Sequence, residues 1–379
     1  MAETSSKGQD FESALEQASE SVAEFDDHRS GFIPWLQHLL HANPSLVPLI
    51  VLALSTLSLG IYIDWGAISV GLGIASPEEV SNGSFRFFKA FTLTLILQQV
   101  QIVGVLAAAQ TLIILTAGID LSVGAIAVLC SVIMGQFTFR YGIPPAASIA
   151  IGLAFGTAIG AVSGWLVSRV KLPPFIVTLG MWQIVLAANY LYSANETIRS
   201  QDIEAQAPIL QLLGTKFTLY GATFTLGVIS MLIIAFALAY ALRSTPWGRH
   251  VYAVGDDPEA AELAGVNRHR TLISVYMLAG LICAFAGWVM IGRFGSVSPS
   301  ATTGVIGNIQ AITAVVIGGI SLFGGRGSIL GALFGALIVG VFELGLRMAG
   351  ADPQWTFLLI GVLIIGAVAV DQWIRKVSI

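Results

Sequence analysis

TLIILTAGIDLSVGAIAVL, residues 111–129, consists of two apolar runs joined by a short turn that contains Gly118, Asp120 and Ser122. Asp120 is the only ionisable side chain in this stretch. The runs extend outward to cover residues 91–116 and 122–138. Apolar runs of this length are typical of helices that cross a membrane.

The composition of the whole chain also indicates a membrane protein. Of its 379 residues, 55% are hydrophobic and 11% are charged, with a mean hydropathy of +0.82. A soluble globular protein carries about 25% charged residues. The 41 glycines suit helices that pack closely in lipid. The chain has no basic patch, so nucleic acid is not an expected partner.

The apolar runs predict an all-α polytopic membrane protein with about ten transmembrane helices, some of them short or broken. The predicted spans are residues 46–63, 91–116, 122–138, 144–168, 174–192, 218–242, 271–291, 309–323, 328–347 and 355–373. A full crossing takes roughly 20 residues. The short spans 122–138 and 309–323 are therefore candidates for broken or re-entrant helices that lie buried among the others.

An even number of spans, here ten, places both termini on the same side of the membrane. The distribution of basic residues between the loops indicates which side that is. With the termini in the cytoplasm, the inner segments hold nine Lys and Arg residues and the outer segments hold seven. Residues 44–379 then form the transmembrane domain, with a cytoplasmic loop at 243–270 and an outer loop at 193–217. Residues 1–43 are expected to be an acidic cytoplasmic tail with a short interfacial helix, because their charge does not fit a signal peptide.

Cysteine and histidine give no sign of a metal site. Cys130 and Cys283 both lie within apolar runs and are interpreted as packing residues. All five histidines lie outside the predicted spans. We therefore expect no metal ion and no histidine proton relay inside the membrane.

The cytoplasmic loop contains PEAAELAG, residues 258–265, which has the start and stop signals of a short helix. A proline precedes an acidic first turn, and a glycine closes the segment. Its small residues Ala260, Ala261, Ala264 and Gly265 would let a partner surface approach closely. An ordinary solvated loop explains the same residues, and this alternative stays open.

Glu259, Ala260, Ala261 and Gly265 reproduce the E-A-A-x-x-x-G pattern of the coupling segment in ATP-driven importer permeases. Three further stretches share this likeness: residues 111–129, KLPPFIVTLG (171–180) and AVVIGGISLFGGRGSILGALFGALIVG (314–340). From about residue 90 to 373, the chain resembles the inner-membrane permeases of bacterial ABC importers for monosaccharides, the ribose, xylose, arabinose, galactose and fructose group.

The resemblance implies a permease subunit that moves a pentose or hexose, with fructose among the candidates, across the bacterial inner membrane by alternating access. It also implies a cytoplasmic ABC ATPase, a periplasmic sugar-binding protein and a second permease copy as partners, all within membrane lipid. No lysine of the chain follows a glycine, so the chain has no P-loop. We therefore expect no enzyme activity and no cofactor on this chain, with ATP and Mg on the partner ATPase.

Candidate site residues fall into three groups. The predicted ATPase-coupling residues are Asp256, Asp257, Glu259, Ala260, Ala261 and Gly265. The predicted gating or inner-face residues are Asp120, Ser122 and Arg326. Asp120 or Ser122 equally fits an N-cap of the following span. Arg326 fits a positive-inside anchor, or a contact with the ATPase or with Asp120.

The third group is the sugar pathway, for which neutral hydrogen-bonding side chains are expected because a monosaccharide is uncharged. The candidates are Gln110, Trp182, Gln183, Asn189, Asn308 and Gln310, together with Gln98, Gln99 and Gln101. Amide pairing between helices explains these residues equally well. Many family members carry acidic residues near the positions of Asn308 and Gln310, and the variant found here is similar to fructose-type permeases.

Two other functions remain as alternatives. An ion-coupled secondary sugar transporter usually places ionisable side chains at mid-membrane, whereas Glu343 and Asp371 lie near the ends of predicted spans. A membrane-embedded enzyme requires a catalytic cluster, and the sequence offers none.

Overall fold

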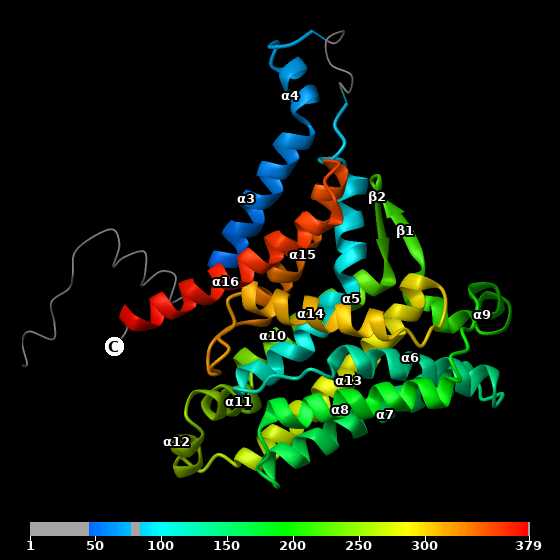
Figure 1. The fold of residues 1–379 in the computed structure, drawn as a ribbon, viewed down its shortest axis with the longest axis vertical. Helices are drawn as coiled ribbons and strands as arrows, with labels where there is room; N and C mark the ends of the chain where they lie inside the picture. Colours follow the sequence, from blue (N-terminus) through cyan, green and yellow to red (C-terminus); the bar gives the residue numbers. More distant parts are fainter. Residues whose placement is uncertain (1–44, 77–83, 378–379) are drawn as a thin grey trace, which may run out of the picture. The chain divides into compact units, whose positions relative to one another are not determined.

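A computed structural model describes residues 45–76 and 84–377 of the chain. The predicted acidic tail and its interfacial helix lie outside these described residues. Almost all of the regular structure in the described chain is helical (Figure 1).

Ten apolar helices correspond in order to the ten predicted spans. Seven are long and apolar enough to cross a membrane: α3 (Leu46–Ile63), α5 (Ala90–Leu115), α7 (Pro145–Ser168), α8 (Pro174–Ser193), α10 (Leu226–Ser244), α13 (Arg268–Phe294) and α15 (Ile329–Met348). The three others hold shorter apolar stretches: α6 (Val123–Phe139), α14 (Ala301–Ile317) and α16 (Pro353–Val377). The predicted all-α polytopic class is thus confirmed.

Seven short elements connect these helices. They are α4 (Trp65–Gly71), α9 (Ser200–Gln206), η2 (Pro208–Gly214), β1 (Lys216–Leu219), β2 (Ala222–Thr225), α11 (Pro246–Asp256) and α12 (Pro258–Leu263). The segments on either side of α10 lie at its opposite ends. Its 19 residues separate those ends by about 28 Å. Accordingly, α9 and the hairpin lie on one side of the picture and α11 and α12 on the other (Figure 1).

The predicted span 218–242 is wrong at its start. Residues 218–225 belong to an antiparallel hairpin in which Lys216 pairs with Thr225. Tyr220 and Gly221 both have positive φ, which is typical of a tight hairpin turn. The helix begins only after Thr225, whose hydroxyl accepts a hydrogen bond from the Val228 amide. The prediction of a helix at residues 218–225 therefore overlooked the hairpin turn at Tyr220 and Gly221.

The predicted span 309–323 is also misplaced, because α14 begins at Ala301 and ends at Ile317. The Ser300 hydroxyl caps its first turn by accepting from the Thr303 amide. The helix ends at Ile317 and is followed by Gly318 and by Gly319, which has a positive φ, so the apolar residues after 319 lie in the next turn. Glycine adopts this conformation without a steric penalty, so the glycines end the helix although the hydropathy continues.

Close backbone contacts build the core of the described chain. Helices α7 and α13 lie side by side, and this pair makes the most extensive helix contact (Figure 1). A Cβ on Gly160 would lie 2.1 Å from the Tyr276 carbonyl oxygen, and one on Gly280 would lie 2.2 Å from the Gly156 oxygen. Larger residues would force the helices apart, so glycine sets their spacing, as expected for helices packed in lipid.

Asp64 fastens the segment after α4 to the end of α3. Its carboxylate accepts hydrogen bonds from the backbone amides of Arg86, Phe87 and Phe88 at 2.7 to 3.1 Å. Burial opposes ionisation of this carboxyl, but the three amides and the Arg86 charge together hold its pKa below the ordinary value. The ionised form of Asp64 is therefore part of the folded structure.

Candidate functional site

A polar recess lies where α6, α13 and the start of α14 meet. It has a volume of about 340 Å³, within the range of small-molecule sites, which is about 300–1,000 Å³. Its lining is rich in hydroxyl groups and has no charged side chain: Val128, Ser131, Met290, Phe294, Ser296, Ser298, Ser300 and Thr303. These hydroxyl residues were not among the predicted pathway residues, although the alternating serines of SVSPS (296–300) are a visible signal.

Two predicted pathway residues adjoin this recess. Trp182 and Asn189 of α8 line a narrow gap that shares Ser300 with it. The gap holds about 10 Å³, room for roughly one water molecule. Asn189 donates a hydrogen bond to the Pro299 carbonyl at 3.1 Å, but its buried Oδ1 has no partner among the described residues. A buried amide oxygen needs a donor, and a hydroxyl of a substrate or water supplies one.

The turn around Asp120 is fastened by side chains from three helices. The Gln110 amide, with its oxygen and nitrogen oriented to satisfy both partners, bonds the Asp120 backbone oxygen at 3.0 Å and the Asp120 backbone nitrogen at 3.2 Å. Thr178 donates to the Ile119 oxygen at 3.0 Å. Asn308 donates to the Leu121 oxygen at 2.6 Å. Gln110 and Asn308, both predicted to line the sugar pathway, therefore fasten this turn, and their contact with sugar stays a prediction.

Asp120 is 3% exposed, and its Oδ1 accepts from the amide and the hydroxyl of Ser122. Ser122, one of the two predicted N-cap residues, is the N-cap of α6, but its hydroxyl donates to Asp120 and makes no capping bond. Arg326 is exposed to solvent. Within the described part of the chain no ion pair joins Arg326 to Asp120, so the structure does not support that predicted contact.

Gln310 and Gln99 meet at a third place, the carboxylate of Glu343 in α15. The Gln310 amide donates to Oε1 at 2.5 Å, and the Gln99 amide donates to Oε2 at 2.8 Å. Gln183, in contrast, is exposed on α8 and lines neither the recess nor the gap. The predicted pathway residues are thus divided among several places in the fold.

The predicted coupling segment is helical. Asp257 caps α12, since its Oδ1 accepts from the amides of Glu259 and Ala260 at 2.9 and 3.0 Å. Asp256, Glu259, Ala260 and Gly265 are exposed. Ala261 was expected on the partner-facing surface, but it is 5% exposed and packs in a cluster with Val254 and Leu272. Its small size serves packing within the chain.

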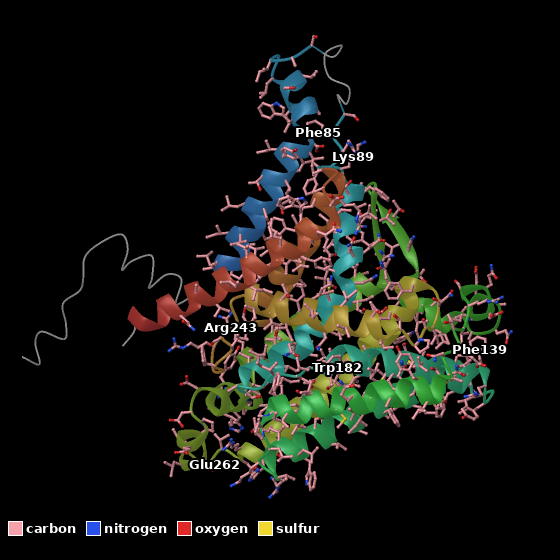
Figure 2. All side chains as sticks on the ribbon, in the orientation of Figure 1. Phe85, Lys89, Phe139, Trp182, Arg243 and Glu262 are labelled. Atoms are coloured by element: carbon pink, nitrogen blue, oxygen red, sulfur yellow. The ribbon has the colours of Figure 1, made fainter. Side chains whose placement is uncertain are left out.

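Leu263 is the side chain that the sequence analysis missed in this segment. It is 91% exposed at the end of α12. The segment lies at the same end of the described helices as Arg243, away from Phe139 (Figure 2). Single exposed apolar side chains are common on protein surfaces, but this one lies in the segment predicted to couple to the ATPase.

Helix α11 contacts two turns of the membrane domain, the turn after α5 and the turn between α14 and α15. A Cβ on Gly255 would lie 1.7 Å from the Leu115 oxygen and 2.8 Å from the Gly325 nitrogen. Gly325 itself donates to the Leu115 oxygen at 3.0 Å. The Tyr252 hydroxyl donates to the Gly327 oxygen at 2.8 Å. Helix α11 therefore contacts both the end of α5 and the turn between α14 and α15.

No group of three His, Cys, Asp or Glu side chains that could hold a metal ion occurs within residues 45–76 and 84–377. Cys130 and Cys283 are both buried free thiols.

Comparison with known proteins identifies related chains. Residues 92–368 match a family described as a permease component of branched-chain amino acid transport systems. The chain is 63% identical to the fructose import permease protein FrcC of Rhizobium meliloti over 98% of this chain and 97% of that protein. It is 36% identical to the ribose import permease protein RbsC of Escherichia coli K12 over 77% of this chain and 89% of that protein.

A third relative is the galactose/methyl galactoside import permease protein MglC of Escherichia coli K12, at 32% identity over 84% of this chain and 97% of that protein. No solved structure matches the chain.

Proposed function

Because this chain belongs to the family of transport-system permease components, we propose that it is the membrane-spanning subunit of an ATP-driven monosaccharide importer. It is a multi-pass membrane protein and a transporter subunit, not an enzyme. Fructose is the proposed substrate, since the relative that shares 63% identity over 98% of this chain is a fructose import permease.

The recess between α6, α13 and α14 is the observation that carries this proposal. Five serine and threonine hydroxyls line it, and no charged side chain does. Neutral hydroxyls can both donate and accept hydrogen bonds, which suits an uncharged polyhydroxylated substrate. Asn189 adds an unpaired acceptor beside it. Sugar would pass through this recess during alternating access, with the Asp120 turn as an inner gate.

ATP would act through a partner ATPase that docks on α12. Leu263 would be the apolar anchor, and the exposed residues Asp256, Glu259, Ala260 and Gly265 would surround it. The contact of Gly255 with Leu115 and Gly325 would carry the ATPase motion to the helical core. In this arrangement ATP and Mg bind only to the ATPase.

The complete importer would contain a second copy of this permease and a periplasmic sugar-binding protein. Both termini and the coupling segment would lie in the cytoplasm, which agrees with the excess of basic residues in those segments. Residues 193–225 would then face the periplasm, where the sugar-binding protein docks.

Uptake of labelled fructose by cells that express the complete importer tests the energy source. With ATP depleted and the proton gradient kept, uptake should stop. With the gradient collapsed and ATP kept, it should continue. Fructose uptake that follows the gradient and ignores ATP would overturn the proposal in favour of an ion-coupled carrier.

Docking on α12 is tested by co-purifying the ATPase with permease variants. Leu263→Asp should release the ATPase without loss of membrane insertion, because the native side chain makes little contact within its own chain. Leu219→Asp is the matched control, an exposed leucine of β1 at the other end of α10. Equal ATPase retention by both variants would rule out Leu263 as the anchor.

A further inference from the structure

Glu343 is a half-buried ionisable residue of the membrane helices that the proposed pathway does not use. It lies in α15, where α5, α14 and α15 pack against one another in all three pairs. Gln99 of α5 and Gln310 of α14 donate one hydrogen bond to each of its two carboxylate oxygens. No Lys or Arg forms an ion pair with it in the described chain. The carboxylate is thus fixed in orientation by neutral groups.

The three side chains are only half-buried, although all three belong to apolar helices of the membrane domain. An ionisable side chain that faces lipid is costly, and such residues almost always face a bundle interior or a water-filled cavity. Placing this face of α5, α14 and α15 against lipid would leave a partly exposed carboxylate and two amides in hydrocarbon. The face is therefore expected to border water.

The remaining hydrogen-bonding capacity is that of an acceptor. A carboxylate has about four lone-pair sites, and the two amides occupy two of them. This arrangement presents several acceptors side by side to neighbouring hydroxyl donors.

We propose that Glu343, held by Gln99 and Gln310, binds hydroxyl groups of the sugar on the water-filled translocation path. This inference rests on the proposed function and adds a charged acceptor to a pathway whose recess is neutral. Two adjacent hydroxyls of one sugar can donate to the two carboxylate oxygens. Gln99 and Gln310 act as positioning residues, since they fix the carboxylate and leave its outer lone pairs free.

Thiol labelling tests whether the site borders water and meets the sugar. The native thiols Cys130 and Cys283 are 0% and 1% exposed, so their background reaction should be small. In the reconstituted importer, Glu343→Cys should react with a charged, membrane-impermeant thiol reagent. Saturating fructose should slow that reaction several-fold, and a sugar that is not transported should not.

Two control positions calibrate the labelling. Tyr220→Cys, at the 97% exposed hairpin turn, should react at a rate that fructose does not change. Ile233→Cys, at a 63% exposed apolar position of α10, should not react. If Glu343→Cys fails to assemble, the labelling rate of Gln310→Cys measures the water access of the same face. An unreactive thiol at this face, or one that sodium ions protect and fructose does not, overturns the proposal.

Uptake kinetics separate binding from a purely structural role. Glu343→Gln keeps the size of the side chain but loses the charged acceptor, so the apparent KM for fructose should rise roughly tenfold, the effect of one charge-assisted hydrogen bond. An unchanged KM refutes sugar binding at Glu343. Wild-type uptake that persists without ATP would refute the proposed energy source and leave fructose-protected labelling at residue 343 as a separate result.

Discussion

Replacing Gln110 with leucine removes the side chain that fastens the Asp120 turn to α5. Gln110 is 0% exposed and Asp120 is 3% exposed. The native amide satisfies both the backbone nitrogen and the backbone oxygen of Asp120, at 3.2 and 3.0 Å. Leucine has a similar size but no polar atoms, so Gln110→Leu leaves both backbone groups unpaired in a site from which water is excluded.

The magnitude follows from these two orphaned groups. Each buried unpaired group costs about 1–3 kcal/mol, so the pair costs about 2–6 kcal/mol of unfolding free energy. Interhelical hydrogen bonds measured in a membrane protein average about 0.6 kcal/mol each, which would give only about 1 kcal/mol. We expect a loss above that lower figure, because the Asp120 carboxylate already bonds Ser122 and does not replace the amide.

Reversible unfolding of the purified permease in mixed detergent micelles, followed by tryptophan fluorescence, measures this loss. Gln183→Leu is the matched control, since the same substitution on an exposed position of α8 breaks no hydrogen bond of the described chain. Equal unfolding free energies for the two variants would refute the structural role of Gln110. A loss of fructose uptake without a loss of stability would instead favour the original prediction that Gln110 contacts the sugar.

Four further substitutions have defined outcomes. Gly255→Ala should abolish uptake and destabilise the fold by about 3 kcal/mol, because its Cβ would lie 1.7 Å from a carbonyl oxygen. Gly265 has a φ of +86° and open space around it. Gly265→Ala should therefore cost only about 1–2 kcal/mol in the same unfolding assay. The pKa of Asp64 is lowered in the fold. Its contribution to stability is therefore present above the ordinary pKa of about 4 and is lost as pH falls through the lowered value. The free energy of unfolding measured against pH should show this loss in acid for the wild type and not for Asp64→Asn. Asn189→Leu should slow fructose uptake about 10-fold by removing the unpaired acceptor, and unchanged uptake would exclude Asn189 from the pathway.

The fold was largely predictable because hydropathy and length report directly on membrane crossing. The two errors have specific causes. At residues 218–225 a strand and a membrane helix are equally apolar, and the positive φ of Tyr220 and Gly221 decides for a hairpin. At residues 318–323 the hydropathy continues while the glycines end the helix. Hydropathy does not detect backbone conformation.

The site was less predictable, because a polar residue in an apolar helix has no visible partner in sequence. Gln110, Asn308 and Gln310 looked alike as pathway candidates, yet two fasten the Asp120 turn and one holds Glu343. Ala261 and Leu263 lie two residues apart, and only the packing of α12 turns the first inward and the second outward.

The sequence by itself determined that this chain spans a membrane, that it has no P-loop, and that a short helix begins at Pro258 and stops before Gly265. These properties follow from local composition and from short-range capping chemistry. The tertiary structure decided which amides meet backbone, which meet the Glu343 carboxylate and which border a recess. Those outcomes depend on contacts between helices far apart in sequence, such as the 244-residue separation between Gln99 and Glu343, and single-residue chemistry does not encode them.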